Sequence, residues 1–203
     1  LPEKLMWAPR EKLIGVACGN SLSLMPETVL RRAMSGKWVL VQLLPHKLQI
    51  ESEAGVVLAL ETSLRLKGCD MHGARVLVWS GAAVEVHEFD DSPGAPRSVG
   101  AFASAAVSGA IWDESLFLLT NGRVEVVNFA GRVKSTLPFM EAEGAPRVVH
   151  IAGGDKGAYV AAGTDQGYIK VWNIERREPK QHAAGRRLVP ERSRITSVQV
   201  TAD

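Results

Sequence analysis

The chain has 203 residues and carries 24 Lys and Arg against 22 Asp and Glu, which gives a formal charge of +2 at pH 7. Nucleic-acid-binding proteins usually have a dominant basic excess, and disordered chains are poor in apolar residues, whereas 46% of these residues are hydrophobic. We therefore expect a folded protein that buries a core and binds no nucleic acid specifically.

No segment is apolar for long enough to cross a membrane, because the longest apolar runs, such as Val56 to Leu60, have about five residues and a transmembrane helix needs roughly 20. Charges interrupt the N-terminal stretch, so no signal peptide is expected. Cys18 and Cys69 lack metal-ligand spacing, which favours reduced thiols and a cytosolic protein. The chain begins with Leu1 rather than Met, so we expect it to be part of a longer protein.

The predicted elements are short strands that form a hairpin four times along the chain. In chain order, the paired strands are Trp38–Leu43 with Lys47–Ser52, Arg75–Trp79 with Ala83–Phe89, Leu116–Thr120 with Arg123–Phe129, and Ala158–Gly163 with Tyr168–Ile174. The third hairpin turns at Asn121-Gly122, a pair that tolerates the positive φ angles of a type I′ turn. Short strands separated by Gly and Pro indicate an all-β protein.

The hairpins are parts of a longer repeat. If Ile50, Val86, Val126 and Val171 are equivalent, the steps between them are 36, 40 and 45 residues. A further strand precedes the later hairpins, and a candidate fourth strand, such as Val133–Leu137, follows. The preceding strands are Leu64–Gly73, Ala106–Glu114 and Pro146–Asp155, with a last copy at Arg194–Asp203. Four antiparallel strands in about 40 residues are typical of one blade of a β-propeller.

The length predicts an incomplete ring of blades. At roughly 42 residues per blade, 203 residues make about 4.8 blades. We expect four to five four-stranded blades: residues 1–27 form the tail of a preceding blade, 28–62, 63–105, 106–145 and 146–191 are blades, and 193–203 form the first strand of the next. The blade faces are expected to be apolar on both sides, as in Val56 to Leu60.

The segment Ala161–Ile174 resembles the end of a WD40 repeat, with Trp172 in the tryptophan position. Asn173 replaces the aspartate of the Trp-Asp pair, Gln166 replaces the turn aspartate, and the sequence has no Gly-His dipeptide. We therefore expect WD40-like blades without the Asp-His-Ser-Trp hydrogen-bond network. The five tryptophans are expected to be core residues rather than an exposed recognition stripe; they are Trp7, Trp38, Trp79, Trp112 and Trp172.

No motif for catalysis or for a cofactor is found. The Gly-rich stretch around Gly153 and Lys156 fails the phosphate-loop pattern, because Gly157 follows the lysine. The histidines show no metal-binding spacing, and the serines lack a GxSxG motif; the histidines are His46, His72, His87, His150 and His182. Asp90-Asp91 indicates an exposed turn. We expect no catalytic residue, no cofactor, no metal site and no enzyme activity.

The segment from Glu175 to Arg194 is the most basic part of the chain, with seven basic and three acidic residues. It is interpreted as a solvated connection between blades, as a docking surface for a protein partner, or as a site for lipid headgroups or RNA. No aromatic residue follows Trp172, which disfavours single-stranded nucleic acid. The candidate partner-binding residues are Arg176, Arg177, Glu178, Lys180 and His182.

Four segments resemble the propeller region of the 140-kilodalton WD-repeat subunit of intraflagellar transport complex A. They are Val41–Glu51, Val76–Phe89, Gly131–Pro146 and Glu175–His182. The most specific likeness lies between Gly131 and His182, where eight residues stand at matching positions: Gly163, Thr164, Lys170, Arg176, Arg177, Glu178, Lys180 and His182.

This resemblance implies a non-enzymatic scaffold that binds other complex A subunits. The function implied is retrograde transport, together with entry of membrane proteins into cilia or flagella, at the cilium or flagellum, the basal body and the cytoplasm. A WD-repeat scaffold of a membrane coat or another complex is the alternative from the same class. An RNA-binding propeller and a propeller hydrolase are the alternatives from other classes.

Overall fold

The computed structural model describes residues 3–8, 10, 13–26, 30–90, 94–154, 157–175, 178–188 and 194–199. The chain divides into two compact units, Leu1–Leu30 and Arg31–Asp203. Within the described residues, all regular structure is antiparallel β-strand apart from one 3₁₀ turn, η1 (Glu141–Glu143), which confirms the all-β prediction. No helix in this part of the chain has the length and apolarity needed to span a membrane.

The first unit is a three-stranded sheet, described here by itself. It is formed by β1 (Lys4–Ala8), β2 (Leu13–Cys18) and β3 (Ser21–Pro26). Trp7 is 50% exposed, and Leu5, Leu22 and Leu24 are more exposed still. The prediction that Trp7 is a core residue is therefore wrong, because the described residues of this unit form a single sheet whose apolar side chains are left exposed.

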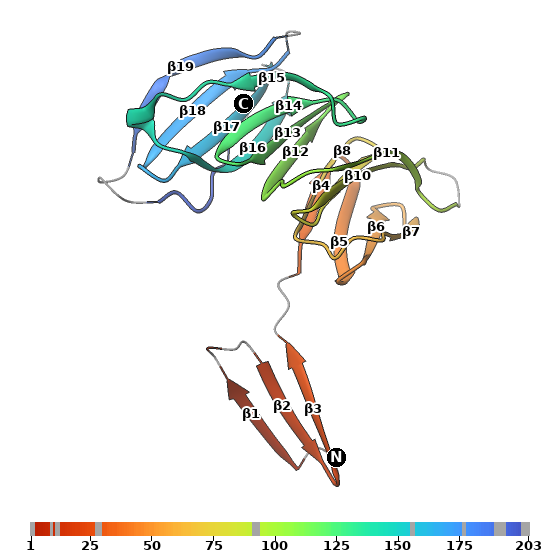
Figure 1. Cartoon of the computed structure of the whole chain (residues 1–203). Helices are drawn as coiled ribbons and strands as arrows, with labels where there is room; N and C mark the ends of the chain where they lie inside the picture. The colour runs from red at the N-terminus through yellow and green to blue at the C-terminus, as the bar shows by residue number, and fades with distance from the viewer. Residues whose placement is uncertain are drawn as a thin grey trace. The chain divides into compact units, whose positions relative to one another are not determined.

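The second unit contains four four-stranded sheets, and each follows the chain order as a meander (Figure 1). The first sheet is β4 (Arg32–Ser35), β5 (Trp38–Leu44), β6 (Lys47–Ser52) and β7 (Val57–Glu61), and the second is β8 (Gly68–His72), β9 (Arg75–Trp79), β10 (Ala83–Glu88) and β11 (Arg97–Ala103). The third is β12 (Ser108–Trp112), β13 (Ser115–Thr120), β14 (Arg123–Val127) and β15 (Val133–Leu137), and the fourth is β16 (Pro146–Gly154), β17 (Gly157–Thr164), β18 (Tyr168–Asn173) and β19 (Lys180–Arg187).

The hydrophobic core lies between neighbouring sheets, as the blades of a propeller require. Three clusters of buried residues fill the three spaces, and a pair across one of them is Phe117 of β13 and Trp172 of β18. Among the described residues, the first strands pack in sequence, β4 on β8, β8 on β12 and β12 on β16. The four sheets form an open series, which confirms the predicted incomplete ring (Figure 1).

Turn chemistry sets the hairpins that build each sheet. Asn121 and Gly122 have φ angles of 47° and 72°, and the strands pair from Thr120 with Arg123 to Leu116 with Val127. Positive φ at both central positions is the type I′ geometry, so the predicted turn is confirmed.

Three of the five tryptophans are core residues. Trp38, Trp79 and Trp172 are 5%, 7% and 1% exposed, whereas Trp112 is half-buried. The indole N–H groups of Trp79 and Trp172 have no hydrogen-bond partner among the described residues. Burial therefore holds these rings without the hydrogen-bond network of a WD40 blade.

The predicted last strand, Arg194–Asp203, is not formed in its described part, residues 194–199. The Ile195 N–H donates to the Thr164 carbonyl at 3.1 Å, and Ile195 is 9% exposed. One backbone hydrogen bond anchors this segment beside the fourth sheet, but a ladder of such bonds is needed for a strand. Residues 200–203 lie outside the described part.

Candidate protein-interaction surface

Strand β19 is the outermost strand of the fourth sheet, and it carries the basic residues singled out in the sequence (Figure 1). Its first residue, Lys180, pairs with Asn173 of β18. Pro179 precedes it and has no N–H to donate, which suits the start of an edge strand. One backbone edge of β19 is therefore left outside the ladder of its own sheet.

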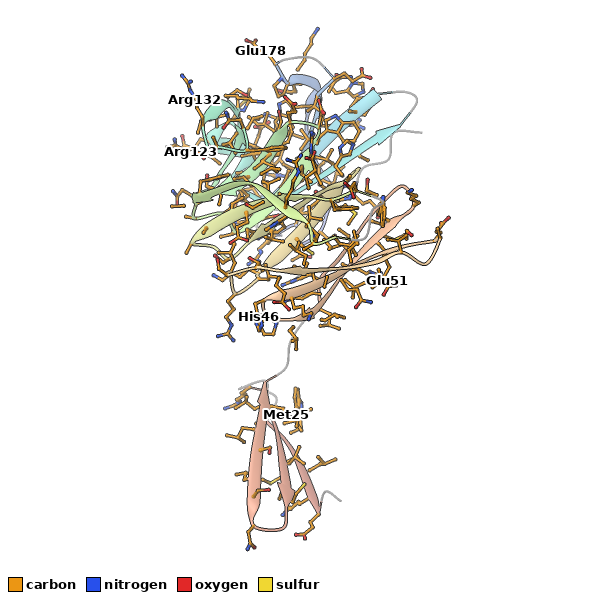
Figure 2. The ribbon with its side chains drawn as sticks, turned by 90° about the vertical axis from the view of Figure 1, so that its right-hand side faces the viewer. Met25, His46, Glu51, Arg123, Arg132 and Glu178 are labelled. Carbon is orange, nitrogen blue, oxygen red and sulfur yellow. The ribbon has the colours of Figure 1, made fainter. Side chains whose placement is uncertain are left out.

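The described candidate residues lie together along this edge. Glu178, Lys180 and His182 are all exposed, and Figure 2 shows Glu178 at the outer rim. Lys180 is the first residue of β19. Arg176 and Arg177 lie outside the described residues.

Aromatic rings from the preceding strands contact the basic strand. The His182 ring lies 5.1 Å from the Tyr159 ring at 72°, and the Arg187 guanidinium lies 5.1 Å from the centre of the Tyr168 ring. Both tyrosines precede Trp172 in the chain, so the segment after Trp172, which has no aromatic residue of its own, does not indicate them. Pairing of β17 with β18 and of β18 with β19 brings them to this face.

A buried ion pair lies beneath β19. The Lys170 ammonium donates to the Glu143 carboxylate and to the Pro138 carbonyl, each at 2.9 Å, and the two charged side chains are 3% and 9% exposed. Burial raises the pKa of Glu143, but the hydrogen bonds from Lys170 and the Met140 N–H outweigh burial and hold the pKa below its ordinary value. No sequence motif indicates this pair, which joins β18 to the connection that holds η1.

Gly185 of β19 lets the strand cross over this ion pair. A Cβ atom there would lie 2.5 Å from a Glu143 carboxylate oxygen and 3.0 Å from Lys170 Cγ. Because only glycine fits, the ion pair sets the position of the outer strand. Strand β19 therefore packs closely against the Lys170–Glu143 ion pair at Gly185.

A channel of about 1040 Å³ runs beside the first strands of the four sheets. Asp70 lines it and accepts a hydrogen bond from the Ile111 N–H at 2.9 Å, and burial raises the pKa of Asp70 to about 6 despite that bond. Burial also lowers the pKa of His72 and of His150. Burial raises the pKa of the Cys69 thiol to about 12, which makes it a poor nucleophile. Within the described ranges, no three His, Cys, Asp or Glu side chains gather as metal ligands.

Comparison with known proteins places the fold and the family. The family model described as the IFT140 second beta-propeller matches residues 36–203. Among solved structures, Hsv2 from Kluyveromyces marxianus is similar at 10% identity and a TM-score of 0.56, over 93% of this chain and 66% of that one. Hsv2 from Kluyveromyces lactis is similar at 11% identity and a TM-score of 0.55, over 93% of this chain and 63% of that one.

The Cps50 (Swd1) β-propeller domain from Myceliophteria thermophila is also similar, at 7% identity and a TM-score of 0.54, over 88% of this chain and 69% of that one. This chain spans just under two thirds of the two Hsv2 structures, 66% and 63%. At these identities the likeness shows the β-propeller fold alone.

Proposed function

Because the chain belongs to the family of the IFT140 second β-propeller, we propose that it is a non-enzymatic protein-interaction scaffold within a subunit of intraflagellar transport complex A. It works beside the other complex A subunits at the cilium or flagellum, and also at the basal body and in the cytoplasm. Its role is to support retrograde transport and the entry of membrane proteins into cilia or flagella.

The observation that carries the proposal is the match over residues 36–203, which includes all of the candidate surface on β19. Exposed Lys180 and His182 begin this edge strand, with Arg176 and Arg177 just before it in the chain. Guanidinium groups make bidentate hydrogen bonds to carboxylates, so an acidic surface of a neighbouring subunit is the chemistry that this segment fits.

Charge reversal tests the proposal in the full-length protein. The variant Arg176→Glu with Arg177→Glu is expected to remain folded and to lose at least one complex A subunit in a quantitative pull-down. Arg65→Glu is the matched control, because Arg65 is exposed on the connection into the second sheet, and it is expected to keep all subunits.

The readouts separate docking from a structural role. A lower melting temperature with unchanged subunits would assign the two arginines to holding the blade edge. Unchanged stability together with unchanged pull-downs would contradict both roles and leave a solvated connection.

A further inference from the structure

In the second and fourth sheets, one side chain of the third strand reaches the connection that leads into that sheet. In the second sheet it is Glu85, whose carboxylate accepts from the Thr62 hydroxyl at 2.6 Å and the Ser63 hydroxyl at 2.9 Å. In the fourth sheet it is Lys170, which bonds to Pro138 and Glu143. In both sheets this side chain therefore bonds the third strand to the connection that leads into the blade. We call this contact a polar latch.

Glu125 holds the equivalent position in the third sheet. It pairs with Leu118 as Glu85 pairs with Val78 and Lys170 with Ala162. Within the described residues, however, the Glu125 carboxylate has no hydrogen bond or ion pair. A pocket of about 170 Å³ lies beside it instead, lined chiefly by Phe102, Ser104, Leu118, Thr120, Glu125 and Gly131.

A second polar atom in this pocket also lacks a partner. Thr120 is 6% exposed, and its hydroxyl oxygen is buried without a hydrogen bond among the described residues. The equivalent hydroxyls of Ser80 and Thr164 each accept from two backbone N–H groups of their turns. A buried unpaired hydroxyl next to an unpaired carboxylate calls for a donor from outside the chain, because unpaired polar groups cost free energy.

The groups around the pocket match those that hold Lys170. The Lys170 ammonium is held by a carboxylate, by a carbonyl oxygen and by the Phe139 ring, whose centre is 5.2 Å away. The pocket offers a carboxylate, a hydroxyl oxygen and the Phe102 ring, which is so close to Gly131 that a Cβ there would lie 2.6 Å from Phe102 Cγ. An alkylammonium group fits this set, since it donates to oxygen and is attracted to aromatic rings.

We propose that this pocket binds the ammonium group of a lysine side chain from a partner protein, with Glu125 as its counter-ion. The volume of about 170 Å³ is below the roughly 300–1,000 Å³ of pockets for drug-sized ligands, so it suits a single side chain. Ala105 and Asn121 are exposed at its rim, and exposed Arg123 projects away from the sheet (Figure 2).

The experiment uses the full-length protein with labelled leucine and threonine methyl groups, and it follows the NMR shifts of Leu118 and Thr120. The probe is N-acetyl-lysine methylamide, and N-acetyl-norleucine methylamide is the matched probe without an ammonium group. We expect the lysine probe to shift both signals, and the norleucine probe to bind at least about tenfold more weakly, because a hydrogen-bonded charge is lost.

Two variants identify the counter-ion. Glu125→Gln is expected to weaken binding of the lysine probe at least about tenfold. Glu141→Gln, at an exposed glutamate outside the pocket, is expected to leave binding of the probe unchanged. Ala105→Lys places an ammonium group at the rim and is expected to block the probe while Glu125 is kept.

Four results would overturn the proposal. The first three are no shift with the lysine probe, equal binding of the norleucine probe, and unchanged binding of the lysine probe to both Glu125→Gln and Ala105→Lys. Free lysine that binds at least tenfold more tightly than the capped probe would also overturn it, because the site would then suit a small metabolite. The basic segment on β19 belongs to another sheet, so this proposal and the scaffold function can fail independently.

Discussion

At the scale of single residues, the fourth sheet depends on one buried ion pair. Lys170 and Glu143 are 27 positions apart in the chain, and nothing in their local sequence marks them as partners. A buried charge whose partner is removed is strongly destabilising, whereas replacement of both charges by apolar groups is often tolerated.

We predict that Lys170→Met lowers the free energy of opening of the fourth sheet by about 3–5 kcal/mol, measured by hydrogen exchange at the β18 amides in the full-length protein. Combining it with Glu143→Met should recover most of this loss. Lys47→Met is the control, because Lys47 and Glu61 form an exposed ion pair at 3.0 Å. It should lower the free energy of opening of the first sheet by less than about 1 kcal/mol. Equal costs for the two lysine variants would contradict this role.

A second prediction at this scale concerns Asp70, whose raised pKa makes the free energy of unfolding depend on pH. Its folded-state pKa of about 6 lies above the ordinary value of 3.8, because burial disfavours the carboxylate. Between these two pH values the unfolded chain releases the proton first, so the free energy of unfolding falls as the pH rises, and this contribution is level above about 6.

Asp70→Asn keeps an oxygen that accepts from the Ile111 N–H and removes the titration. At pH 7.5 the variant should be more stable than the wild-type protein by on the order of 2–3 kcal/mol, measured by hydrogen exchange at β8 and β12 in the full-length protein. The difference should shrink toward pH 4. A difference that does not change with pH would rule out this assignment.

At the scale of elements, the sequence predicted the hairpins well because their determinants are local. Asn121-Gly122 sets both the turn and the register of β13 with β14. Val56 to Leu60 was interpreted as apolar on both faces. In β7, Leu58 and Leu60 are buried, whereas Val57 and Ala59 are exposed. The exposed residues lie on the outer face of the first sheet, which no other described sheet of the second unit covers.

The candidate site was predicted only in part, because local sequence patterns do not show which residues strand pairing brings together. The sequence singled out Lys180 and His182 as candidate partner-binding residues, and the structure places both of them in β19. The rings of Tyr159 and Tyr168 and the vacant latch at Glu125 depend on pairing between strands and on comparison of whole blades. No local pattern encodes them.

Close packing between sheets predicts the effect of a single methyl group. A Cβ on Gly153 of β16 would lie 1.7 Å from the Trp112 ring of the third sheet, whereas nothing lies within 4 Å of one on Gly94. Through overpacking, Gly153→Ala should therefore lower the free energy of opening of β12 and β16 by about 3 kcal/mol. This loss should be seen as faster hydrogen exchange in the two strands. Gly94→Ala should change neither strand, and unaltered exchange in Gly153→Ala would contradict the packing described here.

At the scale of the whole molecule, an open series of blades leaves its terminal faces uncovered. In the first sheet, Leu43, Leu44 and Val57 are 44%, 49% and 58% exposed. Uncovered blade faces and strand edges favour association. Expressed alone, residues 1–203 should therefore aggregate or self-associate in analytical ultracentrifugation, and a monodisperse monomer that melts cooperatively would count heavily against the open propeller.

The proposed scaffold function rests on family membership, on the propeller fold and on the basic outer strand β19. Quantitative affinity purification of the tagged full-length protein from ciliated cells tests it most directly. We expect recovery of intraflagellar transport complex A subunits in near-constant proportions at about 200 mM salt, where purely electrostatic nucleic-acid binding weakens by orders of magnitude. Recovery of membrane-coat subunits or ribonucleoproteins in their place would contradict it.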